Sequence, residues 1–138
     1  CNVMGNGDTK TSSKKNALTN MINTLKKNEE VYIYDDGTPL RDVMHINDVC
    51  AAIKLVMDKG NLNDVYNIGS GQPTAIGDIV GKAKGYLGSK SVIKSREAPD
   101  FHKIVQAKDF WLDTTKLKSL GFQQTISTDD IVKELCAN

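Results

Sequence analysis

The apolar residues between positions 14 and 27 recur at helical spacing. Leu18, Met21, Ile22 and Leu25 occupy positions i, i+3, i+4 and i+7, which predicts an amphipathic helix. Similar apolar stripes predict helices after three N-cap residues, namely Asn47 with a stop at Gly60, Thr74 with a stripe ending at Leu87, and Ser127 near the C-terminus. Asp113 is expected to cap a short helix that ends at Gly121.

Short runs of β-branched and aromatic residues alternate with these helices. The runs predict strands at 1–4, 31–34, 42–46, 65–69 and, weakly, 91–94, most of them closed by Gly or Asp-Gly turns. The pattern predicts one unit of mixed α and β elements over residues 1–138, without repeats or a linker.

The amino-acid composition is that of an ordinary globular domain and does not by itself indicate a function. The 138 residues are 39% hydrophobic and 25% charged, with a net charge of +1, so bulk charge predicts neither a nucleic-acid nor a membrane partner. No apolar run approaches the roughly 20 residues of a membrane span. Lysines exceed acids within residues 1–27, which fits either a solvated helix face or an entrance for an anion.

The cysteines and histidines suggest no structural metal. Cys1, Cys50 and Cys136 form no C-x-x-C pair, and an odd number argues against a disulfide framework. Reduced thiols in a cytoplasmic protein are the simplest inference. His45 and His102 lack zinc-ligand spacing, and His45 is expected to hold Asp48 or a nearby carbonyl instead.

Three sequence clusters together resemble one family. They are Asn2-Val3-Met4-Gly5, then Tyr34-Asp35-Asp36-Gly37 followed by the stretch from Leu40 to Val49, and finally Val65 to Gly71 with Asp113-Thr114-Thr115-Lys116 and Leu120-Gly121-Phe122. In this order they resemble extended short-chain dehydrogenases/reductases (SDRs), the NAD-dependent sugar-nucleotide epimerases and dehydratases. Met4 and Asn6 depart from the family's usual Tyr and Pro.

The resemblance covers only the C-terminal substrate-binding part of that Rossmann-type α/β fold. It implies about four helices with short strands, and a strand at residues 1–5 that would normally join a larger sheet. The dinucleotide-binding half is expected to be absent, because the glycines never adopt G-x-G-x-x-G spacing. NAD(P) would serve the full-length enzyme but is not expected to bind this chain alone.

The resemblance also implies a nucleoside-diphosphate sugar as ligand. Arg41 would grip the diphosphate or the ribose, since its planar fork suits phosphate oxygens; the alternative is a structural pair with Asp42 or Asp48. Asn2 is expected at the diphosphate, and Asn16 either there or as a helix cap.

A further candidate pair comes from counting back from Asp113. Lys103 and Gln106 fall where relatives carry an Arg and an acid for phosphate and ribose. Tyr32 or Ile33 could pack on the base, although packing in the core is the preferred interpretation.

We expect no catalytic residue in this chain. Tyr86 and Lys90 have the family's Tyr-x-x-x-Lys spacing, but Gly88 would end the helix between them. The predicted function is the sugar-nucleotide-binding part of an epimerase or dehydratase, with a free-standing binding or oligomerisation module as the alternative. Exposed apolar edges predict association with another chain, such as a second copy or the missing half, or partial disorder.

Overall fold

The structure is a computed structural model that describes residues 1–7, 16–100, 104 and 107–137. Its elements are β1 (Asn2–Met4), α1 (Ala17–Lys26), β2 (Val31–Tyr34), the 3₁₀ turn η1 (Asp35–Gly37), β3 (Leu40–His45), α2 (Ile46–Lys59), β4 (Pro73–Ala75), α3 (Ile76–Leu87), β5 (Ile93–Arg96), α5 (Thr115–Ser119) and α6 (Thr128–Ala137). The α/β class is therefore confirmed.

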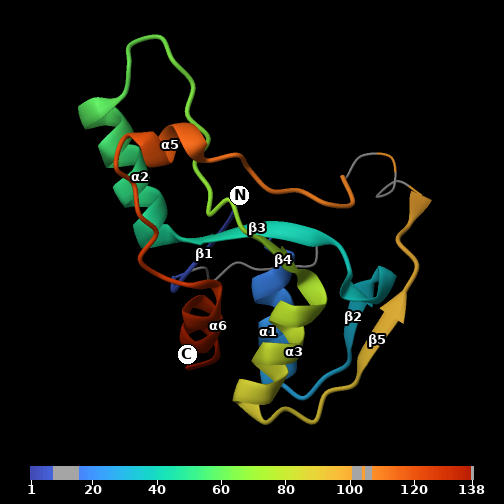
Figure 1. Cartoon of the computed structure of the whole chain (residues 1–138). Coiled ribbons are helices and arrows are strands. Elements are labelled where there is room, and N and C mark those ends of the chain that lie inside the picture. Colours follow the sequence, from blue (N-terminus) through green and yellow to red (C-terminus); the bar gives the residue numbers. More distant parts are fainter. Residues whose placement is uncertain (8–15, 101–103, 105–106, 138) are drawn as a thin grey trace.

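The strands of the described residues form two small sheets. β3 pairs in parallel with β1 and antiparallel with β4, which gives the order β1-β3-β4. A separate parallel pair joins β2 to β5, with Tyr34 opposite Arg96. In Figure 1, β3 crosses the molecule above α1 and α3, while β2 and β5 lie on one side and α2 and α5 on the other.

The main core forms where α1, α3 and α6 pack together beneath β3. Ile22, Leu25, Ile79, Val80 and Ile131 are all at most 1% exposed there. These are the inward positions of the apolar stripes that predicted the three helices. A second cluster joins Met44 and Ala52 to Leu117 and Phe122, and so attaches α2 and α5 to β3.

The helix caps differ in part from the prediction. α2 begins two residues early with His45 as N-cap, because its Nδ1 accepts a hydrogen bond from the Asn47 amide at 3.1 Å. α3 follows Ala75 rather than Thr74, which is held in β4. α5 follows Thr114, although Asp113 still accepts from the Thr115 amide. At the start of α6, Ser127 accepts from the Asp130 amide at 3.1 Å, as the sequence predicts.

The predicted strand at 65–69 does not form. These residues pair with no strand in the described part of the chain, and the ladder next to β3 belongs to β4 instead. Immediately after them, Ser70 and Gly71 donate their amides to the buried Asp42 carboxylate. The backbone amides there donate to a carboxylate side chain instead of to a neighbouring strand.

One side of the fold leaves apolar surface exposed. β1 lies at the end of its sheet and pairs only with β3 among the described residues, and Val3 is 40% exposed. Ile46, Ile53 and Met57 are exposed along one stripe of α2, and the adjoining Cys50 is exposed as well. Within the described ranges, no helix is long and apolar enough to cross a membrane.

Candidate functional site

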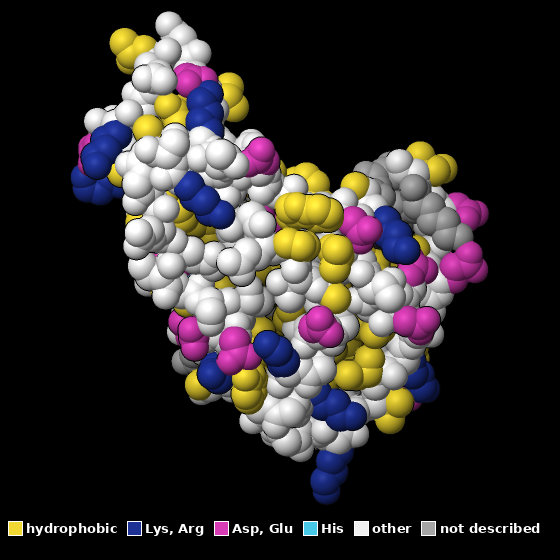
Figure 2. Space-filling model, viewed as in Figure 1, with side chains coloured by type: hydrophobic (Ala, Val, Ile, Leu, Met, Phe, Trp, Pro, Cys, Tyr) yellow, Lys and Arg dark blue, Asp and Glu magenta, His cyan; other side chains and the backbone are white. Residues whose placement is uncertain are grey.

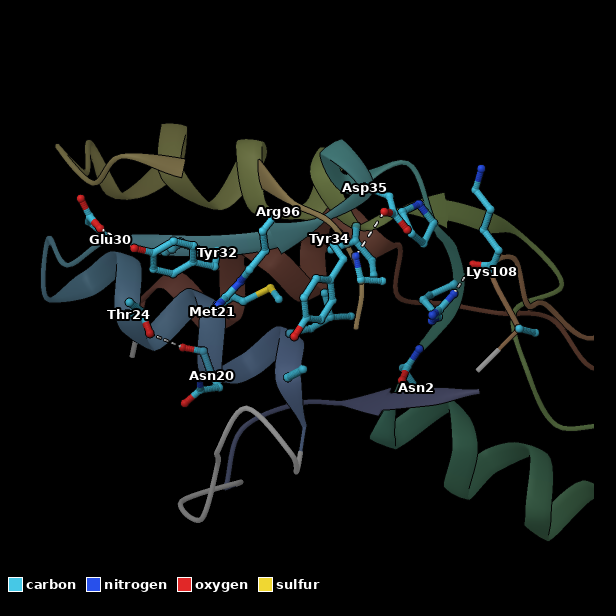
Figure 3. Close-up of a pocket in the computed structure, with 18 residues that line it drawn as sticks. Asn2, Asn20, Met21, Thr24, Glu30, Tyr32, Tyr34, Asp35, Arg96 and Lys108 are labelled. Carbon is cyan, nitrogen blue, oxygen red and sulfur yellow. Dashed lines mark hydrogen bonds between the residues drawn. The ribbon is translucent and has the colours of Figure 1, made fainter. Parts of the chain in front are cut away.

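A groove of about 640 Å³ lies between α1 and the β2–β5 pair. Figure 3 shows side chains entering it from both walls, with Asn2 and Lys108 toward one end and Glu30, Tyr32 and Thr24 toward the other. Its lining residues are Asn2, Ala17, Leu18, Asn20, Met21, Thr24, Glu30, Val31, Tyr32, Tyr34, Asp35, Pro39, Arg41, Ile76, Arg96, Ala98, Ala107 and Lys108.

The β2 pleat decides which of its residues face the groove. Ile33 is buried in the core, whereas Tyr32 is 40% exposed. Since side chains alternate along a strand, Tyr32 and Tyr34 share the groove face. For both residues the sequence pattern favoured packing in the core. That prediction is confirmed for Ile33 and is wrong for Tyr32.

An arginine from β5 covers these two tyrosines. The Arg96 guanidinium carbon lies 4.1 Å from the Tyr32 ring centroid and 5.7 Å from that of Tyr34. The parallel register places Arg96 beside Tyr34 and so brings the three side chains together. Such a distance is typical of a cation–π contact.

Glu30 fixes the outer end of this wall. Its carboxylate accepts from Lys94 Nζ at 2.5 Å and from the Tyr32 hydroxyl at 2.8 Å. These two hydrogen bonds, Lys94 first, lower the pKa of Glu30 below its ordinary value. Glu30 thus remains ionised and holds the Tyr32 ring in place.

Arg41 lies near the Asn2 end of the groove, half-buried on β3. Its Nη1 donates to the carbonyls of Leu40 and Lys108, each at 2.7 Å. In the part of the chain that the structure describes, no carboxylate lies within ion-pair distance of it, so the expected alternative of a pair with Asp42 or Asp48 is wrong. A guanidinium has five N–H donors, and those on Nη2 and Nε donate to none of the described residues, which leaves them for an anion.

The neighbouring Asp42 makes this strand rigid. It is fully buried and accepts from the Ser70 hydroxyl and from the amides of Ser70, Gly71 and Leu112. Burial alone raises the pKa of Asp42, but the hydrogen bonds, led by those from Ser70, outweigh it and hold the pKa below its ordinary value.

A second hollow adjoins the first at Arg41. It measures about 280 Å³ and is lined by Cys1, Asn2, Arg41, Ala107 and Phe110. Asn2 and Arg41 line both cavities, because β1 pairs with β3 and Phe110 bridges to Arg41. The two predicted residues therefore stand together where the cavities meet.

The other predicted site residues have different outcomes. Asn16 is the N-cap of α1 at φ 52°, its side chain accepts from the Thr19 amide at 3.4 Å, and it is not among the groove's lining residues. Lys103 and Gln106 lie outside the described residues.

His45 and Tyr86 have structural contacts. His45 is 3% exposed, but its partner is Glu134, with Nε2 3.2 Å from the carboxylate, and not Asp48. Asp48 instead accepts from Thr125 and Ile126. Tyr86 donates to Asp129 at 2.7 Å, and α3 ends at Gly88 before Lys90, as predicted.

Sequence reasoning missed Arg96, Tyr34 and Lys108. The alternation of Val31 and Ile33 with two tyrosines could have placed Tyr34 beside Tyr32. Nothing local could have placed Arg96, because its neighbours come from a strand about 60 positions away. Lys108 contributes its carbonyl to Arg41, a contact that no sequence pattern marks.

The closely spaced glycines just before β4, Gly69 and Gly71, do not have the surroundings of a dinucleotide site. A Cβ on Gly69 would lie 2.6 Å from Asp42 Oδ2, and one on Gly71 would lie 2.6 Å from Thr114 Oγ1. On the side where a Cβ would stand, this backbone is packed against the protein's own side chains rather than open to a ligand.

Solved structures with the same architecture identify the fold. The crystal structure of a Thermotoga maritima UDP-glucose 4-epimerase with UDP-glucose aligns with a TM-score of 0.81 and 26% identity, covering 99% of this chain and 42% of that one. An epimerase from Methanothermobacter thermautotrophicus aligns with a TM-score of 0.85 at 16% identity, over 99% and 40% of the two chains. The fold is therefore that of a portion of a Rossmann-type structure of the SDR class.

The sequence comparison leads to a family. The family described as "NAD dependent epimerase/dehydratase family" matches residues 1–69. The low-salt glycan biosynthesis protein Agl12 of Haloferax volcanii is 29% identical over 114 residues, which make up 82% of this chain and 36% of that protein. A putative UDP-glucose 4-epimerase of Methanocaldococcus jannaschii is 28% identical over 83% of this chain and 35% of its own length. This chain belongs to the NAD-dependent epimerase/dehydratase family of extended SDRs and spans about a third of these relatives.

Proposed function

We propose that this chain is the nucleoside-diphosphate-sugar-binding part of an NAD-dependent epimerase or dehydratase and is not catalytic by itself. The observation that supports this best is Arg41, which has no carboxylate partner among the described residues and stands beside Asn2 where the two cavities meet. A fixed guanidinium with free N–H groups suits a diphosphate.

The two cavities suggest how the ligand lies. The larger groove, with aromatic residues on one wall, suits the nucleoside, and the smaller hollow beside Cys1 and Phe110 suits the sugar. The diphosphate would then bridge them at Arg41 and Asn2. Such a ligand agrees with the UDP-glucose in the Thermotoga relative's structure.

The remainder of the enzyme would dock on β1 and α2. The outer edge of β1, which pairs with no other strand among the described residues, would extend into a larger parallel sheet, and that sheet would cover the exposed stripe of Ile46, Ile53 and Met57. In the assembled enzyme NAD would supply transient oxidation of the sugar, and the groove would hold the nucleotide while that chemistry takes place.

The alternative is a free-standing binding or oligomerisation module without activity. Figure 2 shows a face hollowed between the α2–α5 side and the β2–β5 side, with acidic and basic side chains interspersed on it. The gene sequence upstream of Cys1 separates the two hypotheses, since an encoded cofactor half supports the first. We also propose a cytoplasmic location, because all three cysteines are free thiols.

Calorimetric titration of UDP, dTDP, GDP and UDP-glucose tests ligand binding. Arg41→Ala should weaken the tightest of them tenfold or more, since a hydrogen bond to a charged group is worth about 1.5–3 kcal/mol. Lys118→Ala on α5, away from both cavities, is the control and should bind as wild type. Absence of binding by the wild-type chain, or an Arg41→Ala variant that binds normally, would refute the proposal.

A further inference from the structure

The Arg96 guanidinium forms no ion pair with any described residue and lies on β5 rather than at a helix terminus. It is exposed, and within the described segments no carboxylate lies within ion-pair distance of its guanidinium. Among the described residues, the guanidinium makes cation–π contacts with the rings of Tyr32 and Tyr34. A groove-lining cation that lies on aromatic rings has one side supported and the other open to a ligand.

Arg96 is also separated from the proposed diphosphate position. Figure 3 places Asn2 and Lys108 toward one end of the groove, and Arg96, Tyr32 and Glu30 toward the other. Arg41 belongs to the first end, because it donates to the Lys108 carbonyl at 2.7 Å. A nucleoside diphosphate that meets Arg41 with its phosphates would therefore extend its base toward Arg96.

We propose that Arg96 is the stacking platform for the nucleobase, an inference that rests on the proposed function. A guanidinium is planar and stacks on flat π-systems, which makes it a platform for any base. Tyr32 supports the platform from behind at 4.1 Å, and Glu30 holds that ring through its hydroxyl. The base would occupy the open face of the guanidinium.

The opposite wall completes a slot for the base. Met21 reaches from α1 toward Arg96 in Figure 3, and both side chains line the groove. A thioether is flexible and packs well on aromatic faces, so Met21 covers the second face of the base. Asn20, on the same wall, offers a donor and an acceptor to the base edge.

The stacking role makes a prediction that a phosphate role does not. Arg96→Lys keeps the charge and removes the plane, so UDP binding should weaken about tenfold, in the range measured for removing one stacked partner. Inorganic pyrophosphate, which has no base, should bind this variant as it binds wild type. Arg41→Ala should weaken both ligands.

Calorimetry with UDP, dTDP, GDP and pyrophosphate on the 138-residue chain tests this directly. Met21→Ala is the second variant and should also weaken the nucleotides while sparing pyrophosphate. Lys118→Ala on α5, which lines neither cavity, is the control and should stay within about twofold of wild type for every ligand. Thermal unfolding of each variant verifies that the fold is kept.

The outcomes separate the two proposals. Wild-type nucleotide binding that Arg96→Lys leaves unchanged would overturn the stacking role and leave the sugar-nucleotide site standing. An equal loss of UDP and pyrophosphate would make Arg96 a phosphate ligand and also overturn it. If the wild-type chain binds none of the nucleotides, both proposals fail.

Discussion

The Asp42 carboxylate accepts a hydrogen bond from the Ser70 hydroxyl at 2.6 Å, although the two residues are 28 positions apart. This contact attaches the segment before β4 to the middle of β3, directly beside Arg41. With the amides of Ser70, Gly71 and Leu112 it forms a closed network around one buried charge. These hydrogen bonds fix the position of β3, the strand that carries Arg41.

Asp42→Asn should destabilise the chain strongly. The new amide group would face N–H donors, leaving buried groups unsatisfied at a cost of about 2–3 kcal/mol in the free energy of unfolding. Urea unfolding measures the difference. Ser70→Ala, which removes one donor, should cost about 1 kcal/mol. An Asp42→Asn curve that overlays the wild-type curve would contradict the role of this network.

The same carboxylate should make stability depend on pH in the acid range. The pKa of Asp42 in the folded chain is below the value of 3.8 expected for a free Asp. Its contribution is therefore complete above that value and is lost as pH falls through the folded pKa. Urea midpoints between pH 6 and pH 2 should fall for wild type and fall less for Asp42→Asn; equal slopes would argue against the shift.

Gly37→Ala should be among the costliest single substitutions. Gly37 has φ +73°, and a Cβ there would lie 2.6 Å from the Gly77 Cα in the first turn of α3. Strain and clash together should cost about 3 kcal/mol, measured by urea unfolding.

Gly81→Ala is the matched control, because no atom lies within 4 Å of its added Cβ in the middle of α3. A gain of about 0.5–1 kcal/mol is expected there. Similar effects at the two positions would show that η1 and α3 do not approach as closely as described.

Asn16→Gly separates the two roles expected of Asn16. Glycine accepts φ 52° and costs only a few tenths of a kcal/mol at an N-cap, so thermal unfolding should change little. If the amide also reaches the diphosphate, UDP affinity should fall severalfold in calorimetry. Unchanged affinity would leave Asn16 as a cap alone.

Ile53→Glu should reduce self-association. Its side chain is 45% exposed on the apolar stripe of α2, where a charge opposes burial against another chain. Sedimentation velocity at rising concentration should show less dimer than wild type. Ala51→Glu, exposed on another face of α2, should behave like wild type; equal dimerisation of all three would exclude this stripe as the interface.

The helices were the most predictable part of the fold. The stripes around Ile22, Ile79 and Ile131 are local patterns, and the residues that they place inside are buried. The first residues of α2 and α3 were harder to predict, because His45 and β4 compete with Asn47 and Thr74 for the same positions. The strand expected at 65–69 failed because a strand also needs a neighbour, which Asp42 and β4 together exclude.

The sequence by itself determined the family and the α/β class and marked Arg41 as a candidate ligand residue, since each depends on residue type and order along the chain. Only the tertiary structure decided that Asn2 and Arg41 line the same two cavities and that the Arg96 guanidinium lies over the Tyr32 ring. Both arrangements result from parallel pairing between strands far apart in the chain, β1 with β3 and β2 with β5. The physical reason is that parallel register is set by packing of the whole core, which no local run of residues encodes.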